Sequence, residues 1–342
     1  MSFERFTPDD FIVSSDAISA TAWTTGSPTL IAFYTSSTQD LGSSGDYYLN
    51  VFDTAATSSI QFAIAYGNAA GSGSENYDQA VNGKSPTGTI FGQWQDLVIG
   101  DENTNFTFGA ITSSEFFALP IERQCYKEAI FLGSLTLKIS GSDGVISLTD
   151  NSNYVTSIQF NNAGRVFQLI SGSAGVKYTG LNSDGYSTSS GSYGWLLPDI
   201  GTIILNPLAL AQSEANGGIG FLYSGSATAS AAPNTSPNTA LFQAITASAA
   251  SFFTLNSQET ITSDFVFVRP RSSQFNYSEN PSFISGSTGE VLYPQFINNP
   301  TTYITTIGLY NDTNELLAVA KLSRPLQKDF TKEALVRVKL DF

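Results

Sequence analysis

The chain contains no histidine and a single cysteine, Cys125. Histidine is the commonest general base and a frequent metal ligand, so its absence excludes Ser/His and Cys/His nucleophile pairs and the usual zinc sites. A lone cysteine excludes an intramolecular disulfide, and without an activating imidazole we expect Cys125 to be a buried, inert thiol. The residues therefore predict no enzyme, no cofactor and no metal.

Charge is also scarce, because only 13% of the residues are charged, and basic residues are outnumbered by acidic ones, 15 to 29. The resulting net charge of −14 disfavours nucleic acid and anionic membrane surfaces as partners. No apolar run reaches the roughly 18 residues that a transmembrane helix needs, and the N-terminus lacks the apolar core of a secretory signal. We expect neither nucleic-acid binding nor membrane insertion.

Hydrophobic residues are plentiful at 41%, and Ser, Thr, Asn and Gly fill much of the remainder. Short alternating segments such as 134–140 and 260–269 are separated by Gly, Asn and Asp turns, which is typical of antiparallel β proteins. We predict a mainly β fold of sandwich-like or barrel-like domains with a few short helices. Residues 90–99 could form a helix or a strand, and Asn206-Pro207 is expected to start a short helix that stops at Gly217-Gly218. The expected domains are 1–140, a central 141–268 with long Ser/Gly loops and a helix near 237–250, and a C-terminal docking unit at 269–342.

Residues 303–325 predict two strands joined by a tight turn at 311–314, where Asn and Asp tolerate positive φ. A further strand, half-buried by its pattern, is expected at 334–342. Several basic residues fall in this part of the chain, although none occurs in 6–83 or 178–268. They could be solvated strand edges, or they could dock on an acidic neighbouring subunit.

Other patterns are weaker candidates for chemistry. The Gly-rich stretch 67–74 lacks the lysine of a phosphate loop and is followed by Glu75 and Asp78. An interface loop at 67–85 is therefore preferred, as it is at 171–194 and 224–238. Carboxylate pairs such as Asp9/Asp10 or Asp101/Glu102 could serve a glycosidase but are more often solvated loop acids. The oxygen-rich stretches 150–153 and 312–315 lack the full calcium-loop pattern and are interpreted as turns.

Residues 275–281 (FNYSENP), 303–325, and 328–335 with the terminal VRVKLDF resemble virion structural proteins of large contractile-tailed bacteriophages. Residues 304–321 are similar to a segment of tail-collar and baseplate-associated proteins, with Asn311 and Asn314 where such segments often carry Asp and Gly. The resemblance covers the C-terminal part of the chain, with weaker similarity at 66–74. It implies an oligomeric structural role in a tail, baseplate or neck, and localisation in a virion that is assembled in the host cytoplasm.

Other virion structural proteins and copies of the chain are the expected partners. The alternatives are a neck or capsid decoration protein, or a host-receptor or glycan-binding fibre module that stacks sugars on Trp23, Trp94 or Trp195. The candidate interface residues all lie in the C-terminal unit: Tyr303, Ile307, Tyr310, Lys321, Arg324, Lys328, Lys332, Arg337 and Lys339.

Overall fold

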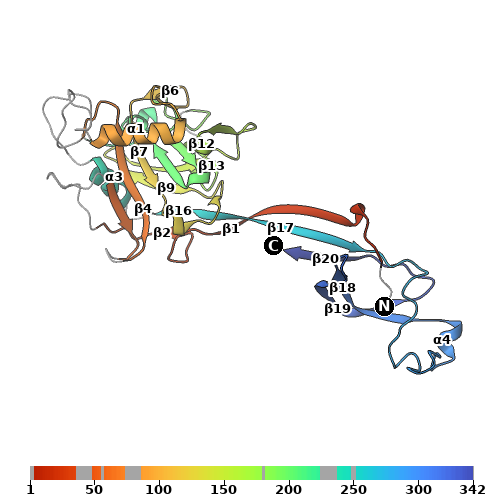
Figure 1. Ribbon diagram of the computed structural model, residues 1–342. Helices are drawn as coiled ribbons and strands as arrows, with labels where there is room; N and C mark the ends of the chain where they lie inside the picture. Colours follow the sequence, from red (N-terminus) through yellow and green to blue (C-terminus); the bar gives the residue numbers. More distant parts are fainter. Residues whose placement is uncertain are drawn as a thin grey trace. The chain divides into compact units, whose positions relative to one another are not determined.

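The computed structural model describes residues 4–35, 48–54, 58–73, 86–178, 182–223, 237–247 and 252–341. The fold is mainly β with antiparallel sheets, one of them a curled half-barrel, and the helices are few and short, which confirms the predicted fold class (Figure 1). Two of the predicted interface loops, at 67–85 and 224–238, lie largely outside the described residues.

The chain divides into two compact units, and they differ from the three expected segments. Unit 1 comprises residues 1–17 and 260–342, and unit 2 comprises residues 18–259. The expected boundary at residue 140 falls between two strands that pair with each other, Ser140 opposite Val145. A domain boundary there would cut a hairpin, so the segments 1–140 and 141–268 contribute to one unit.

Unit 2 is built around one large antiparallel sheet. In spatial order its main strands are β2 (Thr29–Leu30), β16 (Phe253–Thr254), β9 (Thr136–Ser140), β10 (Val145–Asp150), β12 (Gly164–Ser173), β14 (Gly194–Leu197), β15 (Thr202–Leu205), β7 (Glu115–Pro120), β4 (Ile60–Asn68) and β3 (Tyr48–Phe52). The smaller strands are β11 (Gln159–Asn161) and β13 (Val176–Lys177), which pair with β12, the hairpin of β5 (Phe106–Phe108) and β6 (Ile111–Ser113), and β8 (Ala129–Ile130).

Both faces of the central strands are buried, which explains their continuous apolar runs. Along β7, Phe116 and Ala118 belong to one core cluster, while Phe117 and Leu119 belong to the other. Successive strand residues point to opposite faces, so a run without polar interruptions marks a strand that is covered on both sides. The same alternation holds in β15, where Ile204 lies in one cluster and its two neighbours lie in the other.

Helices provide part of this cover. Helix α1 (Pro86–Ile99) lies across one face of the sheet, and the stretch 90–99, for which a helix or a strand was expected, is therefore helical (Figure 1). Gly67 of β4 permits this close approach, because a Cβ there would lie 3.2 Å from the Phe91 backbone and 2.8 Å from the Phe116 ring. Helix α3 (Pro237–Thr246) contributes Leu241 and Ile245 to the other core cluster.

Only the first turn of the helix predicted from Asn206 to Gly217 is α-helical, as α2 (Pro207–Leu210). The Asn206 side chain accepts a hydrogen bond from the Leu208 backbone N–H at 3.2 Å, which is the expected N-cap. A separate 3₁₀ turn follows and ends at Gly217, whose φ of 84° is the left-handed stop that the sequence suggested.

The stretch 171–194 differs from the expected partner-covering loop in part, because several of its described residues are built into unit 2. Strand β12 runs into it, and Ser187, Ser190 and Ser192 are buried within unit 2. The Asn206 amide donates to the carbonyl oxygens of Ser190 and Ser192, both at 2.9 Å. The small polar residues therefore serve internal hydrogen bonding, which composition alone could not distinguish from a loop reaching outward.

Unit 1 contains two small sheets and a four-residue helix, α4 (Gln295–Asn298). Strands β1 (Phe11–Thr21), β17 (Asn256–Val268) and β20 (Val336–Asp341) form one sheet, and both β1 and β17 continue into unit 2 by sequence. Strands β18 (Thr302–Tyr310) and β19 (Leu316–Lys328) form the hairpin that the sequence predicted. Val266, Leu309 and Val338 make a small apolar core.

Candidate functional site

The hairpin of unit 1 has the turn chemistry that its sequence predicts. The Asn311 side-chain oxygen accepts hydrogen bonds from the backbone N–H groups of Thr313 at 3.1 Å and Glu315 at 2.8 Å. Asn314 adopts a left-handed φ of 63°. These local bonds hold the turn in one conformation and set the ends of β18 and β19 side by side.

The two faces of the hairpin differ in what they contact. Ile307, Leu309 and Ala320 point inward and pack in the core of unit 1. Gly308 and Val319 pair across the strands on the opposite, outer face. A Cβ at Gly308 would lie 2.9 Å from the Tyr310 ring, so the absence of a side chain lets that ring lie over the outer face.

A register shift near the turn exposes further apolar side chains. Leu309 pairs with Ala318, whereas Tyr310 pairs with Leu316, so Leu317 has no paired position. Such a bulge breaks the alternation of the strand, and Leu316 and Leu317 are both exposed although they are adjacent. The exposed fractions of Leu317 and Val319 are 68% and 57%. We call Tyr310, Leu316, Leu317 and Val319 the hairpin patch.

The outer face of the β17–β20 pair has a different character, because its charged and aromatic side chains contact each other. The Arg337 guanidinium lies 5.2 Å from the centre of the Phe265 ring, and the Lys339 ammonium lies 6.0 Å from it. Lys339 also pairs with Asp341 at 2.8 Å. The Lys339 and Ser263 side chains together hold the pKa of the Asp341 carboxyl below its usual value. This face therefore carries an ordered row of charges.

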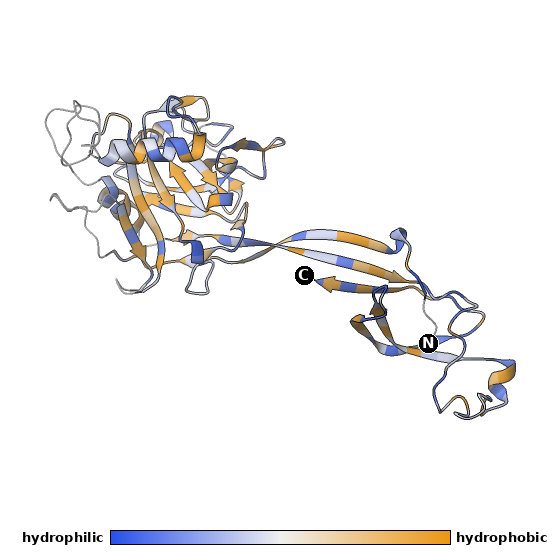
Figure 2. Cartoon of the chain, in the orientation of Figure 1, coloured by the Kyte–Doolittle hydropathy of each residue, from blue (hydrophilic) through white to orange (hydrophobic). Residues whose placement is uncertain are grey.

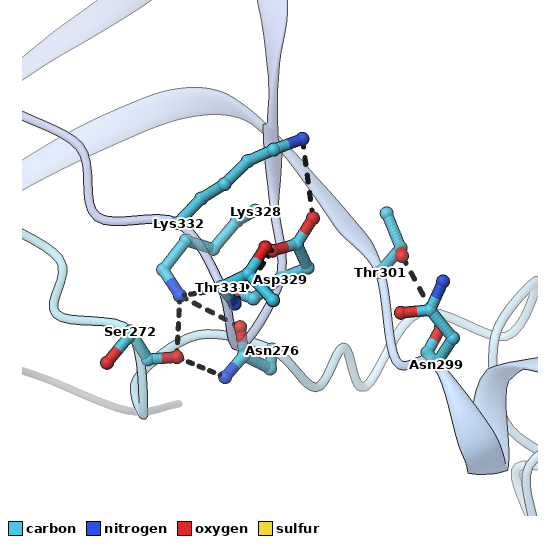
Figure 3. A network of polar contacts seen from close by, with 8 residues as sticks. All are labelled: Ser272, Asn276, Asn299, Thr301, Lys328, Asp329, Thr331 and Lys332. Carbon is cyan, nitrogen blue, oxygen red and sulfur yellow. Dashed lines mark hydrogen bonds and ion pairs between the residues drawn. The ribbon is translucent and has the colours of Figure 1, made fainter.

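Lys328 lies in the interior of unit 1 and not at its surface. Figure 3 shows its polar contacts. Its side chain is 0% exposed, and its ammonium donates to the Ser272 carbonyl, the Asn276 side-chain oxygen and the Asp329 carbonyl, each at 2.9 Å. Phe275, which precedes Asn276 in this loop, has a positive φ of 55°, an unfavourable conformation for an aromatic residue. Lys328 thus holds the 272–276 loop against the end of β19. The prediction that Lys328 is an interface residue is therefore corrected, because its side chain is buried within unit 1.

Lys332 lies beside the same network but on the surface, as Figure 3 also shows. Its ammonium pairs with the Asp329 carboxylate at 3.3 Å. The Asp329 carboxylate also accepts hydrogen bonds from the Thr331 hydroxyl and backbone N–H, and these bonds lower the pKa of that carboxyl. Lys332 and Lys328 are close in sequence but occupy opposite environments.

The other predicted interface residues also differ in whether their side chains pack inside unit 1 or are exposed. Ile307 packs in the unit 1 core and offers little to a partner. Tyr310 and Lys321 belong to the outer face of the hairpin. The predicted residues that are exposed are Tyr303, Tyr310, Lys321, Arg324, Lys332, Arg337 and Lys339.

Sequence reasoning missed several exposed apolar residues that the structure adds to this surface. Phe11, Ile12 and Val13 are adjacent in β1 and all exposed, and the exposed Phe330 and Leu335 lie in the connection between β19 and β20. Figure 2 shows the apolar segments along the strands of unit 1. The sequence signal for these exposed residues is a pair of adjacent apolar residues at the start of a strand or after a turn. Successive strand residues point to opposite faces, so one residue of each pair must point away from a core that covers only one face.

Among the described residues of unit 2, Glu115 is a buried carboxylate that contacts a cluster of neutral side chains. It accepts hydrogen bonds from the hydroxyls of Tyr66 and Tyr223, each at 2.5 Å, and from the Asn68 amide at 3.2 Å. Burial and the neighbouring Glu115 charge raise the pKa of both tyrosines. The cluster anchors the segment ending at Tyr223 to β4 and β7.

The other acidic candidates are used in local turns. Asp10 accepts from the Thr7 backbone N–H and hydroxyl, both at 2.8 Å, and Asp101 accepts from the Thr104 hydroxyl at 2.6 Å. Asp150 accepts from the backbone N–H groups of Gly133 and Ser152. Among the described residues, no group of three or more His, Cys, Asp and Glu side chains could hold a metal ion.

The thiol and the tryptophans are largely interior. Cys125 is buried as predicted, and burial raises the pKa of its thiol to about 11. Trp23 and Trp195 are buried in the two cores of unit 2, and Trp94 is partly buried against one of them. These side chains therefore do not form an exposed stacking surface in the described structure.

Comparison with protein-family models, with curated proteins and with solved structures finds no match to this chain. In the part of the chain that the structure describes, no helix has the length and apolar character needed to cross a membrane.

Proposed function

We propose that the chain is a structural subunit of a contractile-tailed bacteriophage particle, in its tail or baseplate, and that unit 1 docks it onto neighbouring subunits. Its partners are copies of the chain and other virion structural proteins. The resemblance of residues 275–281, 303–325 and 328–335 supports the class of particle. The hairpin patch supports the mode of action and carries the proposal.

Burial of the hairpin patch supplies a driving force for assembly. Exposed apolar groups gain roughly 25 cal/mol for each Å² that a partner removes from water. Clustered apolar side chains are typical of interaction sites in soluble proteins. Lys321 borders the patch on the same face, which matches the apolar centre and polar rim of many interfaces.

The basic side chains of unit 1 guide the approach to a partner. Arg337 and Lys339 project from one face of β20, whereas unit 2 has far more acidic than basic residues. Charge complementarity of this kind raises association rates and fixes orientation more than it raises affinity. The excess of acidic residues in unit 2 of a neighbouring copy would therefore attract the basic side chains of unit 1.

Sedimentation of the full chain tests the docking function. We expect concentration-dependent association that Leu317→Glu abolishes, because a carboxylate would have to be buried without a partner. Ile31→Glu is the matched control, since Ile31 is an aliphatic side chain of unit 2 with an exposed fraction of 75%. A wild-type chain that stays monomeric alone, and whose hairpin patch stays exposed in the assembled particle, would overturn the proposal.

A cryo-EM map of the particle tests the location. Density for residues 303–325 packed against another subunit at the tail end would support the tail or baseplate assignment. Density on the neck or capsid shell would favour a decoration protein. Density at an exposed fibre tip would favour host recognition.

A further inference from the structure

Unit 2 contains a small open pocket that lies apart from the features discussed above. Its volume is about 180 Å³. The residues that carry the argument are Tyr178, Tyr186, Tyr193, Asn182 and Glu214, with Val145 at the apolar side. Pockets for drug-sized ligands usually measure about 300–1,000 Å³, so this one has room for a small head group only.

Three tyrosines line the pocket, and they are held in different ways. The Tyr193 hydroxyl donates to the Gly217 carbonyl at 2.5 Å, so this side chain is fixed. The backbone N–H of Tyr178 donates to the Ser171 carbonyl at 2.9 Å, while its side chain has an exposed fraction of 52%. Tyr186 is half-buried, and burial together with Asp184 raises the pKa of its hydroxyl. The Tyr186 phenol therefore remains neutral at physiological pH.

Glu214 gives the pocket its charge. It is the only ionisable carboxylate among the described lining residues, and it stands at the start of a 3₁₀ turn that ends at Gly217. No ion pair between described residues involves Glu214. Asp184, which is close enough to Tyr186 to raise its pKa, adds negative potential nearby.

The basic side chains of unit 2 that the structure describes are engaged elsewhere. Arg165 pairs with Asp199 at 2.5 Å, and Lys127 pairs with Glu259. The others lie over aromatic rings: Arg123 over Tyr126, Lys138 over Phe252 and Lys177 over Tyr154. Among the described residues, unit 2 therefore supplies no competing cation for the Glu214 carboxylate.

We propose that this pocket binds the head group of an organic cation, an alkylammonium or guanidinium group. Aromatic rings attract cations through their quadrupole, and a carboxylate at the rim adds a direct charge partner. An anion would be repelled by Glu214, and a purely apolar group would gain nothing from its charge. The cation could be a free quaternary ammonium compound or a Lys or Arg side chain of another protein.

Calorimetric titration of the full chain with choline tests the proposal. We expect saturable binding that weakens at least about tenfold in Glu214→Gln and about fivefold in Tyr178→Ala, as loss of a charge partner and of a cation–π contact implies. Tyr34→Ala and Asp96→Asn are controls, since both alter exposed residues of unit 2 outside the pocket and should leave binding unchanged. Urea unfolding of each variant checks that the fold is retained.

The uncharged carbon analogue of choline separates charge from shape. Equal affinity for choline and for this analogue, unchanged choline affinity in Glu214→Gln, or no binding of any probe would overturn the proposal. Titrations with tetramethylammonium, lysine amide and arginine amide distinguish the sources. Preference for the quaternary compounds indicates a free ligand, and preference for the amides indicates a protein side chain. The proposal does not depend on the phage assignment.

Discussion

Unit 2 and unit 1 use their apolar residues in opposite ways. In unit 2, strands such as β7 and β15 are buried on both faces, and most large apolar side chains lie in two continuous cores. In unit 1, the only buried apolar residues among those described are Val266, Phe283, Leu309 and Val338. Both units are β structures, so strand content does not distinguish them. The location of the apolar side chains distinguishes the two units, because most of them lie in the interior of unit 2 whereas many of them are exposed in unit 1.

The largest expected effect comes from the same substitution made in each unit. Leu119→Ala removes a fully buried side chain in unit 2 and should lower the free energy of unfolding by about 3–5 kcal/mol. Leu309→Ala in the thinner core of unit 1 should cost about 2 kcal/mol, because water and neighbouring side chains can fill the space more easily.

Two observables report these changes separately. All three tryptophans lie in unit 2, so their fluorescence during urea unfolding follows that unit alone. Hydrogen exchange of β18 and β19 follows unit 1. Equal losses for the two leucine variants would break the comparison, because unit 1 would then have a core as tight as that of unit 2.

Lys328 shows how unit 1 compensates for its small core. Lys328→Met keeps the length of the side chain but leaves three oxygen acceptors without their donor, and should cost unit 1 about 2–3 kcal/mol. Lys332→Met is the matched control, since this exposed lysine forms only a surface ion pair and should change stability by less than about 1 kcal/mol. Faster exchange in the hairpin of the first variant alone is the expected readout. Similar exchange in both would show that Lys328 does not stabilise the unit.

The Glu115 cluster predicts a pH dependence that is confined to unit 2. The pKa values of Tyr66 and Tyr223 are raised in the folded chain above the ordinary value of 10.0. The unfolded chain therefore loses protons first, so their contribution is complete below pH 10 and falls as the pH rises above it. Tyr223→Phe should cost about 2 kcal/mol near neutral pH and flatten this decline. Tryptophan-detected urea unfolding at pH 8 to 11 measures both effects, and an unchanged slope in the variant would contradict them.

The smallest effect is expected at the exposed charges of unit 1. Lys339→Ala removes an ion pair with Asp341 and a contact with Phe265, but both partners are accessible to solvent. The change in stability should stay below about 1 kcal/mol, while the association rate with an acidic partner should fall and lose part of its salt dependence. Stopped-flow association at two salt concentrations measures this. A large loss of stability would instead assign Lys339 to the fold.

The sequence predicts those features that depend on local chemistry. The turn at Asn311 and Asn314, the N-cap at Asn206 and the strand at Val336–Asp341 follow from residue preferences and alternation, and they are present. The conformation of the hairpin can therefore be predicted from its own residues. The choice between helix and strand for 90–99 could not be made, because its apolar run fits both periods until the packing against β4 is known.

Features that depend on distant contacts were not predictable. A lysine at the end of a strand suggests solvent, and Lys328 is buried only because the 272–276 loop closes over it. Strand β1 was missed since its adjacent residues Phe11, Ile12 and Val13 show no alternation. The tyrosine pocket unites Tyr178 and Glu214 from separate segments, and nothing in either segment alone indicates the other.

Side-chain footprinting by hydroxyl radicals, on the isolated full chain and on the assembled particle, tests the central claim most directly. The account predicts strong labelling of Tyr310, Leu316 and Leu317 in the isolated chain and their protection in the particle. Ile31 of unit 2 is the internal reference, because its side chain is also accessible in the isolated chain, with an exposed fraction of 75%. Equal labelling of Leu316 and Leu317 in both samples would contradict the claim that the exposed apolar face of unit 1 is a subunit contact.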